Sequence, residues 1–448
     1  MANGNDSDSH TIRIWQVNKD RLASMQQRIA DTPRILSRSA GKSFCCIFKV
    51  PQSFIDINGR CYQPQIVSVG PYHHGDSRLQ MIEEHKWRFL GTLLRRMQGR
   101  GLSLEDLLEA MQPLEARARE CYSANIHFST DEFVEILVVD GCFLIELFRK
   151  FGGVVAFEAG DPLLSLKWIY SFLRRDLIRL ENQIPFFILQ CLFDLTKLPG
   201  EESSPTLSNL ALQFFNTSFQ RSEEFINKFN VSESKHLLDF LRSSFIPERH
   251  EEPKKEEMKD EYRSSAAILS ISKLRRAGIR LKATKEDSLL VIKFRRGAIE
   301  MPTITVDDFM CSFLLNCVAY EQCHRHCSTH MTTYATLLDC LINTVKDVEY
   351  LCDKNIMENC LGTDAEVARF INNLGKDVSL DVDSCYLSEL FADVNNYYKN
   401  HWHVYWASFK YTYFNTPWSF ISALAALVLL LLTIAQTYFT TLAYVRPP

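Results

Sequence analysis

The C-terminal segment places the strongest constraint on how this chain can fold. No charged side chain occurs between Lys410 and Arg446, and residues 418–439 read WSFISALAALVLLLLTIAQTYF. A membrane-spanning helix needs about 20 mainly apolar residues, whereas a buried helix of a soluble protein is usually shorter and keeps some polar face. The sequence therefore predicts one transmembrane helix, held in a lipid bilayer by Trp418, Phe420, Ile421, Leu424, Leu427, Leu430, Ile434 and Phe439.

The charges around this segment bear on its orientation. Lys399 and Lys410 precede the span and only Arg446 follows it, which favours a large domain on the cytoplasmic side. The N-terminus lacks the apolar region of a signal peptide, and Ala2 stands where N-myristoylation needs glycine. We expect a single-pass protein of the plasma membrane or of an endomembrane.

Three glycosylation sequons keep the opposite orientation open. They begin at Asn5, Asn216 and Asn230. Such sequons are used only where the domain is exported from the cytoplasm. Because the tripeptide often arises by chance, the prediction of a cytoplasmic domain stands.

Composition limits the function classes. The formal net charge is −4 over 448 residues, so no general electrostatic attraction to nucleic acid is expected. A hydrophobic fraction of 46% is typical of a globular protein. The 14 cysteines are scattered through apolar runs and form no dense disulfide framework.

Hydrophobic periodicity predicts a mainly α-helical fold with minor β elements. We expect a polar N-terminal segment (1–40), a helical domain (41–410) with an exposed charged loop near 247–263, and the anchor with a short tail (411–448). Helices are predicted at 79–97, 133–148, 163–193 with a break around Pro185, 264–277, 307–321, 333–352 and 364–374. Strands are predicted at 45–50 and 66–69, with a hairpin formed by 289–294 and 299–306.

Several short motifs follow one another in a fixed order. The motif residues that we interpret as structural are Pro51, Gly70, Pro71, Tyr72, His73, His74, Gly75, His85, Lys86, Trp87, Asp140, Gly141, Glu181, Asn182, Gln183, Pro185, Phe186, Glu321 and Gln322. This order resembles the plant family called domain of unknown function 247, from about Ile47 to Thr437. The stretch from Leu314 to Val318 departs from the family pattern.

The resemblance implies a plant-specific membrane protein with a C-terminal membrane segment and no established enzymatic activity. In grasses, members of this family are associated with self-incompatibility as pollen-side recognition factors. The resemblance therefore implies a protein partner, whose identity the sequence does not give.

Two clusters contain residue types that bind metals. His73 and His74 could converge with Glu83, Glu84 and His85, although Glu84 and His85 point about 100° apart on a helix. The alternative, which we favour, is a turn shaped by glycine and proline that packs its rings on the helix. The second cluster contains Cys323, His326, Cys327 and His330, but it lacks the Cys-x₂-Cys spacing of a structural zinc site. We assign no metal, cofactor or catalytic residue.

The carboxylates within apolar segments are interpreted as structural. Asp140 lies in an almost wholly apolar helix, where a carboxylate must be paired or hydrogen-bonded. We expect its partner to be Arg174, Arg175 or a backbone N–H. Glu181 and Asn182 are expected to satisfy buried polar groups before the bend at Pro185.

Two function classes remain open. No Gly-x-Ser-x-Gly and no phosphate-binding glycine loop is present, which favours a membrane-anchored recognition, signalling or scaffold protein. The alternative is a membrane-bound enzyme, dependent on a metal held by the His73 or Cys323 cluster.

Overall fold

The computed structural model describes residues 18–30, 45–158, 160–198, 205–229, 234–247, 270–324, 326–399 and 417–445. The predicted charged loop, most of the polar N-terminal segment and the sequons at Asn5 and Asn230 lie outside these ranges.

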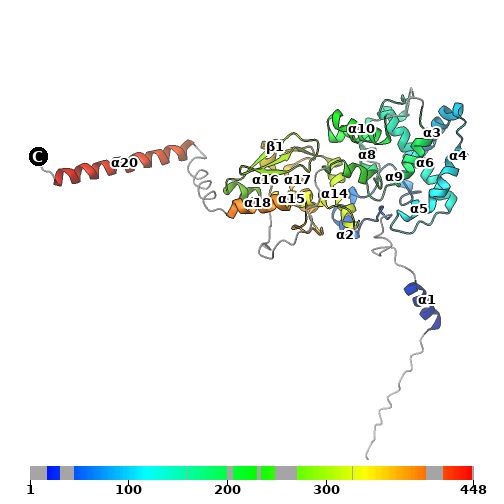
Figure 1. Ribbon diagram of the computed structural model, residues 1–448, viewed down its shortest axis with the longest axis horizontal. Coiled ribbons are helices and arrows are strands. Elements are labelled where there is room, and N and C mark those ends of the chain that lie inside the picture. Colours follow the sequence, from blue (N-terminus) through cyan, green and yellow to red (C-terminus); the bar gives the residue numbers. More distant parts are fainter. Residues whose placement is uncertain are drawn as a thin grey trace, which may run out of the picture.

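The fold is mainly α-helical, as predicted (Figure 1). The first part contains α1 (Lys19–Ala30), α2 (Gln52–Asn58), η1 (Gly59–Cys61), η2 (Ser77–Leu79), α3 (Gln80–Met97), η3 (Gln98–Arg100), α4 (Leu104–Met111), η4 (Gln112–Leu114), α5 (Glu115–Glu120) and α6 (Thr130–Phe151). The middle contains α7 (Pro162–Ser165), α8 (Lys167–Leu177), α9 (Phe186–Leu195), α10 (Leu207–Phe219), α11 (Glu223–Lys228), α12 (Leu237–Ser243) and α13 (Ile271–Arg276). The last part contains β1 (Arg280–Thr284), β2 (Lys293–Arg295), β3 (Ala298–Pro302), β4 (Ile304–Val306), α14 (Asp308–Cys323), α15 (His330–Leu341), α16 (Val345–Asp353), β5 (Met357–Asn359), α17 (Asp364–Leu374), α18 (Ser388–Lys399) and α20 (Pro417–Val445).

Helix α6 is the centre of the larger, helical side of the molecule. Ser129 caps its N-terminus in a capping box with Glu132, and every residue from Ile136 to Lys150 is buried. Helices α3, α9 and α10 pack around it. The prediction of a central helix at 133–148 is therefore confirmed, because only a helix that is covered all round can be apolar all round.

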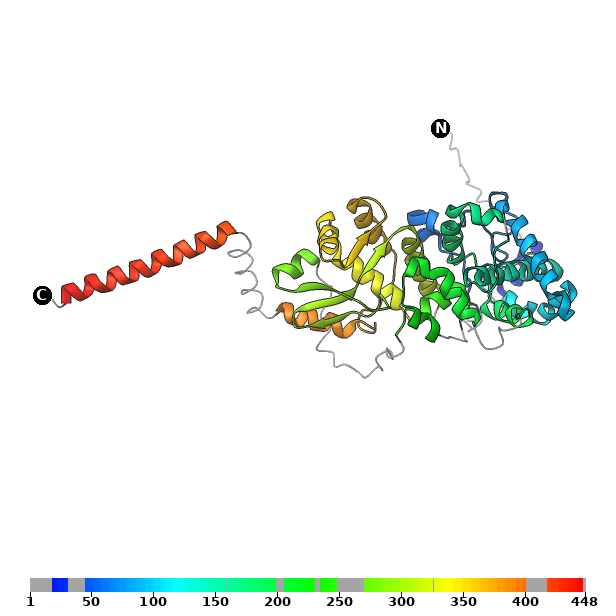
Figure 2. The ribbon, with the colours of Figure 1, turned by 90° about the horizontal axis from the view of Figure 1, so that it is seen from above.

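The strands lie at the other end of the molecule, beside α15 to α18 (Figures 1 and 2). The predicted hairpin is present as β2 and β3, which pair antiparallel with Phe294 opposite Ile299. Two pairings were not predicted: β1 lies parallel to β3, and β4 lies parallel to β5. The predicted helix at 333–352 is two helices, because Thr344 and Asp347 form a capping box that begins α16.

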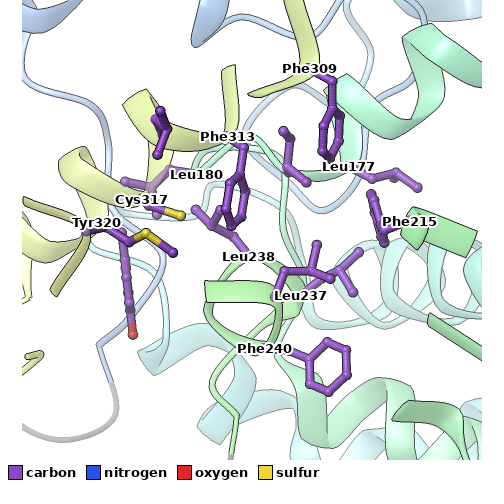
Figure 3. Close-up of a cluster of buried hydrophobic side chains, with 14 of the residues drawn as sticks. Leu177, Leu180, Phe215, Leu237, Leu238, Phe240, Phe309, Phe313, Cys317 and Tyr320 are labelled. Carbon is purple, nitrogen blue, oxygen red and sulfur yellow. The ribbon is translucent and has the colours of Figure 1, made fainter. Parts of the chain in front are cut away.

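Helix α14 joins the two ends of the molecule. It contacts α8 and α12 on the helical side and α15, α17 and β4 on the other. Figure 3 shows Phe309, Phe313, Cys317 and Tyr320 of α14 packed with buried side chains of α8, α10 and α12. Each buried side chain of this size contributes roughly 1.5–3 kcal/mol, so this shared core ties distant parts of the sequence into one body.

Helix α20 lies apart from this body in both views (Figures 1 and 2). Its segment from Phe420 to Leu442 is long and apolar enough to cross a membrane, and none of it is buried. All eight predicted anchor residues are exposed, from 45% for Phe420 to 79% for Trp418. The helix begins at Pro417, whose missing N–H costs nothing at this position.

Candidate functional site

An extended segment, residues 65–70, crosses the interior, and side chains bind its backbone N–H groups. Oδ2 of Asp176 in α8 accepts from the N–H groups of Gln65, Ile66 and Val67, at 2.8, 2.7 and 3.1 Å. Buried N–H groups must be paired. Here one carboxylate accepts the hydrogen bonds that the carbonyl groups of a neighbouring strand would otherwise accept. The predicted strand at 66–69 is therefore wrong, although the segment is buried as a strand would be.

The N–H groups of Val69 and Gly70, at the end of this segment, are also bound by side chains. The N–H of Val69 donates to Oδ1 of Asn182 at 2.7 Å, and Nδ2 of Asn182 donates back to the carbonyl of Val67 at 3.1 Å. The N–H of Gly70 donates to Oδ2 of Asp140 at 2.8 Å. Motif residues from two other blocks of the sequence, Asp140 and Asn182, thus fix this segment together with Asp176.

Lys86 in α3 completes this network from the other side. Its ammonium group lies 2.6 Å from Oδ1 of Asp140 and 2.6 Å from Oε1 of Glu83, and it donates to the carbonyl of Ser68 at 2.6 Å. Burial lowers the pKa of Lys86, but the two carboxylates outweigh burial and hold the pKa above its ordinary value. Lys86 is therefore a buried, charged link between α3, α6 and the loop.

The prediction for Asp140 left three partners open, and the structure selects one of them. Its bond from a backbone N–H, that of Gly70, is confirmed. The two arginines have other partners: Nε of Arg174 donates to the carbonyl of Phe214 at 3.0 Å, and Arg175 pairs with Asp308 at 3.0 Å.

Glu181 binds residues 49 and 50, which precede the segment 65–70 in the sequence. Its carboxylate lies 2.7 Å from Nζ of Lys49 and 3.4 Å from Nε2 of His73, and it accepts from the N–H of Val50 at 2.8 Å. Burial raises the pKa of Glu181, yet these partners outweigh it and the net pKa is lowered. The predicted strand at 45–50 is wrong, because it forms only an isolated bridge between Ile47 and Tyr122.

Gln183 binds the bend that contains Pro185. Its Nε2 donates to three carbonyl groups within residues 177–182, and its Oε1 accepts from the N–H of Leu238 at 3.0 Å. Phe186 then begins α9, with its N–H bound to the carbonyl of Lys235 at 2.8 Å. The expectation that this motif satisfies buried polar groups is confirmed.

Four other motif residues shape the backbone. Gly70 has φ +76°, and a Cβ there would lie 2.4 Å from the carbonyl oxygen of Gln183. A Cβ on Gly141 would lie 2.4 Å from a methyl group of Leu192, so α6 and α9 approach closely there. Pro51 precedes α2, and Pro71 is buried directly after Gly70.

Tyr72 joins the loop to the chain before α6. Its hydroxyl group donates to the carbonyl of Ile47 at 3.2 Å and accepts from the N–H of Ala124 at 3.0 Å. Its ring lies edge-on to Tyr122, with 5.3 Å between the centroids.

Glu321 and Gln322 act at the end of α14. Glu321 lies 2.7 Å from Nε of Arg242 and accepts from the N–H groups of Met331 and Thr332. The Gln322 amide forms two bonds of 3.0 Å with the backbone of Ser379. Both residues of this motif therefore join α14 to segments that follow it.

The histidines of the first metal candidate face different surroundings. His73 points toward Glu181, and His74 packs edge-on against Phe128 with 5.5 Å between the centroids. His85 is half-buried in α3, and its pKa is lowered by burial. Within the described ranges, no three His, Cys, Asp or Glu side chains are grouped so that they could hold a metal ion.

The second candidate cluster is also divided. The ring of His330 stacks on Tyr386 at 4.7 Å, whereas the thiol group of Cys323 is half-buried at the end of α14. His326 and Cys327 lie in the turn between α14 and α15. These described positions supply no metal-holding group of three, so the structure adds no support to the metal-dependent alternative.

A hollow opens at the surface directly above the Lys86 network. Its volume is about 310 Å³, and the residues that line it include Ser68, His74, Asp76, Gln80, Glu83 and Glu84. Asp76 is paired with Arg78 at 2.6 Å. Hydrogen bonds to Arg78 lower the pKa of Asp76 to about 2, so this carboxylate remains charged at neutral pH. The hollow is open to solvent and is lined in part by motif residues, and we take it as the candidate functional site.

Several residues of the network were missed by sequence reasoning. Asp176 and Arg179 form a buried pair with 3.0 Å between Oδ1 and Nε, and their i, i+3 spacing within an apolar segment is a signal that could have found them. His236 and Arg242 gave no such signal, because their partners Cys46 and Glu321 are far away in the sequence.

Comparison with known proteins identifies a family match and two similar proteins. A profile for a family described as "Plant protein of unknown function" (DUF247) matches residues 47–432. A UPF0481 protein of Arabidopsis thaliana is 37% identical over 432 residues, which is 92% of this chain and 90% of the relative. A second, putative UPF0481 protein of that plant is 24% identical over 481 residues, covering 88% and 89%. No solved structure matches the chain.

Proposed function

Because the chain belongs to the DUF247 family of plant proteins of unknown function, we propose that it is a single-pass membrane protein whose helical body recognises a protein partner. The observation that carries this proposal is the exposure of α20. Its apolar side chains contact no core, and half or more of the surface of Leu427, Leu430 and Phe439 is open. Water is an unfavourable solvent for such a surface, whereas a bilayer accommodates it.

The geometry of α20 supports a transmembrane role. Its 23-residue apolar segment is roughly 35 Å long at 1.5 Å per residue, close to the 30 Å of a hydrocarbon core. Four threonine hydroxyl groups donate to backbone carbonyls one turn back, at 2.7–2.8 Å: those of Thr433, Thr437, Thr440 and Thr441. Polar groups in lipid must be satisfied within the protein, and these are.

The structural engagement of the motif carboxylates favours a role in partner recognition over catalysis. The motif carboxylates Asp140, Glu181 and Glu321 are held by cations and backbone N–H groups, as a rigid scaffold requires. The motif region also exposes a hollow to solvent. We infer that the body presents a surface to a partner.

We propose a cytoplasmic body, on the basis of the basic residues before the span. The sequon at Asn216 supports this orientation, since both ends of its amide are engaged: Oδ1 accepts from the N–H of Arg221 and Nδ2 donates to its carbonyl. An attached glycan would replace one of the two Nδ2 hydrogens and would crowd the second bond.

Protease protection in sealed plant microsomes tests the orientation. The protein carries an N-terminal tag, and we expect added protease to destroy the tag without detergent. A tag that survives until detergent is added would overturn the cytoplasmic proposal and indicate a body that faces the lumen or the cell exterior. A lumenal marker protein serves as the control for sealing.

A further inference from the structure

The hollow above Lys86 carries a net negative charge. Four carboxylates lie in or directly beneath it: Asp76, Glu83, Glu84 and Asp140. Two cations oppose them, Arg78 on Asp76 and Lys86 between Glu83 and Asp140. Four negative charges against two positive ones leave two in excess. Glu84 is exposed and takes part in no ion pair among the described residues.

An unpaired hydroxyl group lies at the wall of the hollow. Ser68 is only 1% exposed, and its Oγ has no hydrogen-bond partner, although its carbonyl is bound by Lys86. A buried polar atom without a partner is energetically unfavourable. A ligand that brings N–H donors into the hollow would remove this cost.

One face of α3 carries an exposed indole ring about one turn beyond Glu84, which lines the hollow. Gln80, Glu84, Trp87 and Gly91 are spaced i, i+4, i+7 and i+11, so they share one stripe of the helix. Trp87 is 49% exposed, and a Cβ on Gly91 would meet nothing within 4 Å. The stripe therefore leads from the carboxylate of Glu84 to an open aromatic surface.

We propose that this hollow binds an arginine side chain of the partner protein. A guanidinium group supplies a positive charge for Glu84, N–H donors for Glu84 and for Oγ of Ser68, and a flat face that stacks on Trp87. Lysine supplies the charge but neither the planar fork nor the stacking face. This inference rests on the proposed recognition function, for which it names the chemistry of the contact.

The exposed tryptophan beside a carboxylate makes this surface suitable for a protein interface. Tryptophan and arginine are the residues that most often dominate binding energy in protein interfaces. A guanidinium over an indole is attracted to the face of the ring, and a charged hydrogen bond adds to this attraction. Together they give a contact that selects arginine without a large buried area.

The test uses full-length protein in detergent micelles, labelled with 5-fluorotryptophan, and N-acetyl-arginine amide as the probe. The fluorine signal of Trp87 is assigned by its loss in Trp87→Phe. We expect this signal to shift in a saturable way with the arginine probe. The uncharged isostere N-acetyl-citrulline amide should bind at least about tenfold more weakly, because it lacks the cation.

Matched variants locate the contact. We expect Glu84→Gln to weaken binding about tenfold or more, and Ser68→Ala and Trp87→Ala to weaken it severalfold. Binding by the Trp87→Ala protein is measured by calorimetry. Glu105→Gln in α4 and Trp168→Ala in α8 are the controls, since both side chains are exposed away from the hollow; neither should change binding.

The proposal is overturned if citrulline and arginine amides bind equally, or if Glu84→Gln leaves the affinity unchanged. This outcome is distinguishable from failure of the proposed function. A protein that binds arginine amide but does not associate with membranes would refute the membrane role alone. A membrane-bound protein that ignores the probe would refute only the arginine contact.

Discussion

The ammonium group of Lys86 lies 2.6 Å from the carboxylate of Asp140, in the buried contact between α3 and α6. Both side chains are at most 2% exposed. Asp140 also fixes the loop through the N–H of Gly70. This pair is therefore the point at which two helices and the motif loop are joined.

Removal of one member of this pair should be strongly destabilising. We expect Asp140→Ala to lower the free energy of unfolding by about 3–5 kcal/mol, because it leaves the Lys86 charge buried with less compensation. Urea unfolding of the full-length protein in micelles measures the change. Glu224→Gln, in an exposed pair with Lys228, is the control and should leave the midpoint unchanged. Unchanged stability of Asp140→Ala would refute the structural role.

Gly70 should tolerate no side chain. Its φ of +76° and the 2.4 Å approach of the Gln183 carbonyl to a Cβ predict a loss of at least about 2 kcal/mol in Gly70→Ala. Gly91→Ala is the matched control, since open space surrounds Gly91 in α3. It should stabilise the protein by about 0.5–1 kcal/mol. Equal effects of the two changes on the unfolding midpoint would contradict the close approach at Gly70.

Stability should fall as the pH is lowered from 7 toward 4. Burial lowers the pKa of His236 to about 4, whereas an unfolded histidine has a pKa of about 6.5. The unfolded chain thus takes up a proton first, and stability is lost between these two values. The loss from this site alone is about 3 kcal/mol.

The variant His236→Gln checks this assignment. Its amide can still donate to the carbonyl of Cys46, which Nε2 of His236 approaches at 3.1 Å, but it does not titrate. Burial also lowers the pKa of His324, so the variant should have a shallower pH dependence rather than none. A slope equal to that of the wild type would show that His236 is not the titrating group.

Thiol reactivity should single out one cysteine. All 14 cysteines lie in the described ranges, and Cys360 is the one that is exposed. Burial raises the pKa of Cys142 and of Cys45 to about 12, which removes the reactive thiolate at pH 8. We expect Ellman's reagent to modify about one thiol rapidly, and Cys360→Ser to abolish this phase. Several fast thiols in the native protein would contradict the lower exposure of the other cysteines, which are buried or half-buried.

Local sequence patterns predicted the helices that have a long or regularly spaced set of apolar residues. The long C-terminal helix α20 and the central helix α6 follow from long apolar runs, and α17 was placed at 364–374 as observed. The segment 66–69 was misassigned because an apolar run reports burial but not the hydrogen-bond partner. Here the partner is Asp176, more than 100 residues away.

The site shows the same division. The histidines and glycines between residues 70 and 75, and the carboxylates of Asp140 and Glu181, were identified from the order of the motifs in the sequence. The pairing of Asp140 with Lys86 was not predicted, because Lys86 is 54 positions away on another helix, whereas the expected cations were Arg174 and Arg175. The exposure of Trp87 was likewise hidden, since an apolar residue at helical spacing is usually buried.

Alkaline carbonate extraction of plant microsomes tests the membrane proposal most directly. Full-length protein should remain in the pellet at high pH, as an integral membrane protein does. A variant with Leu427→Arg and Leu430→Arg should move to the supernatant, because each arginine at the centre of a span costs about 2.5–3.5 kcal/mol. Release of the full-length protein by carbonate, or retention of both forms to the same extent, would contradict the proposal that α20 anchors this protein in the bilayer.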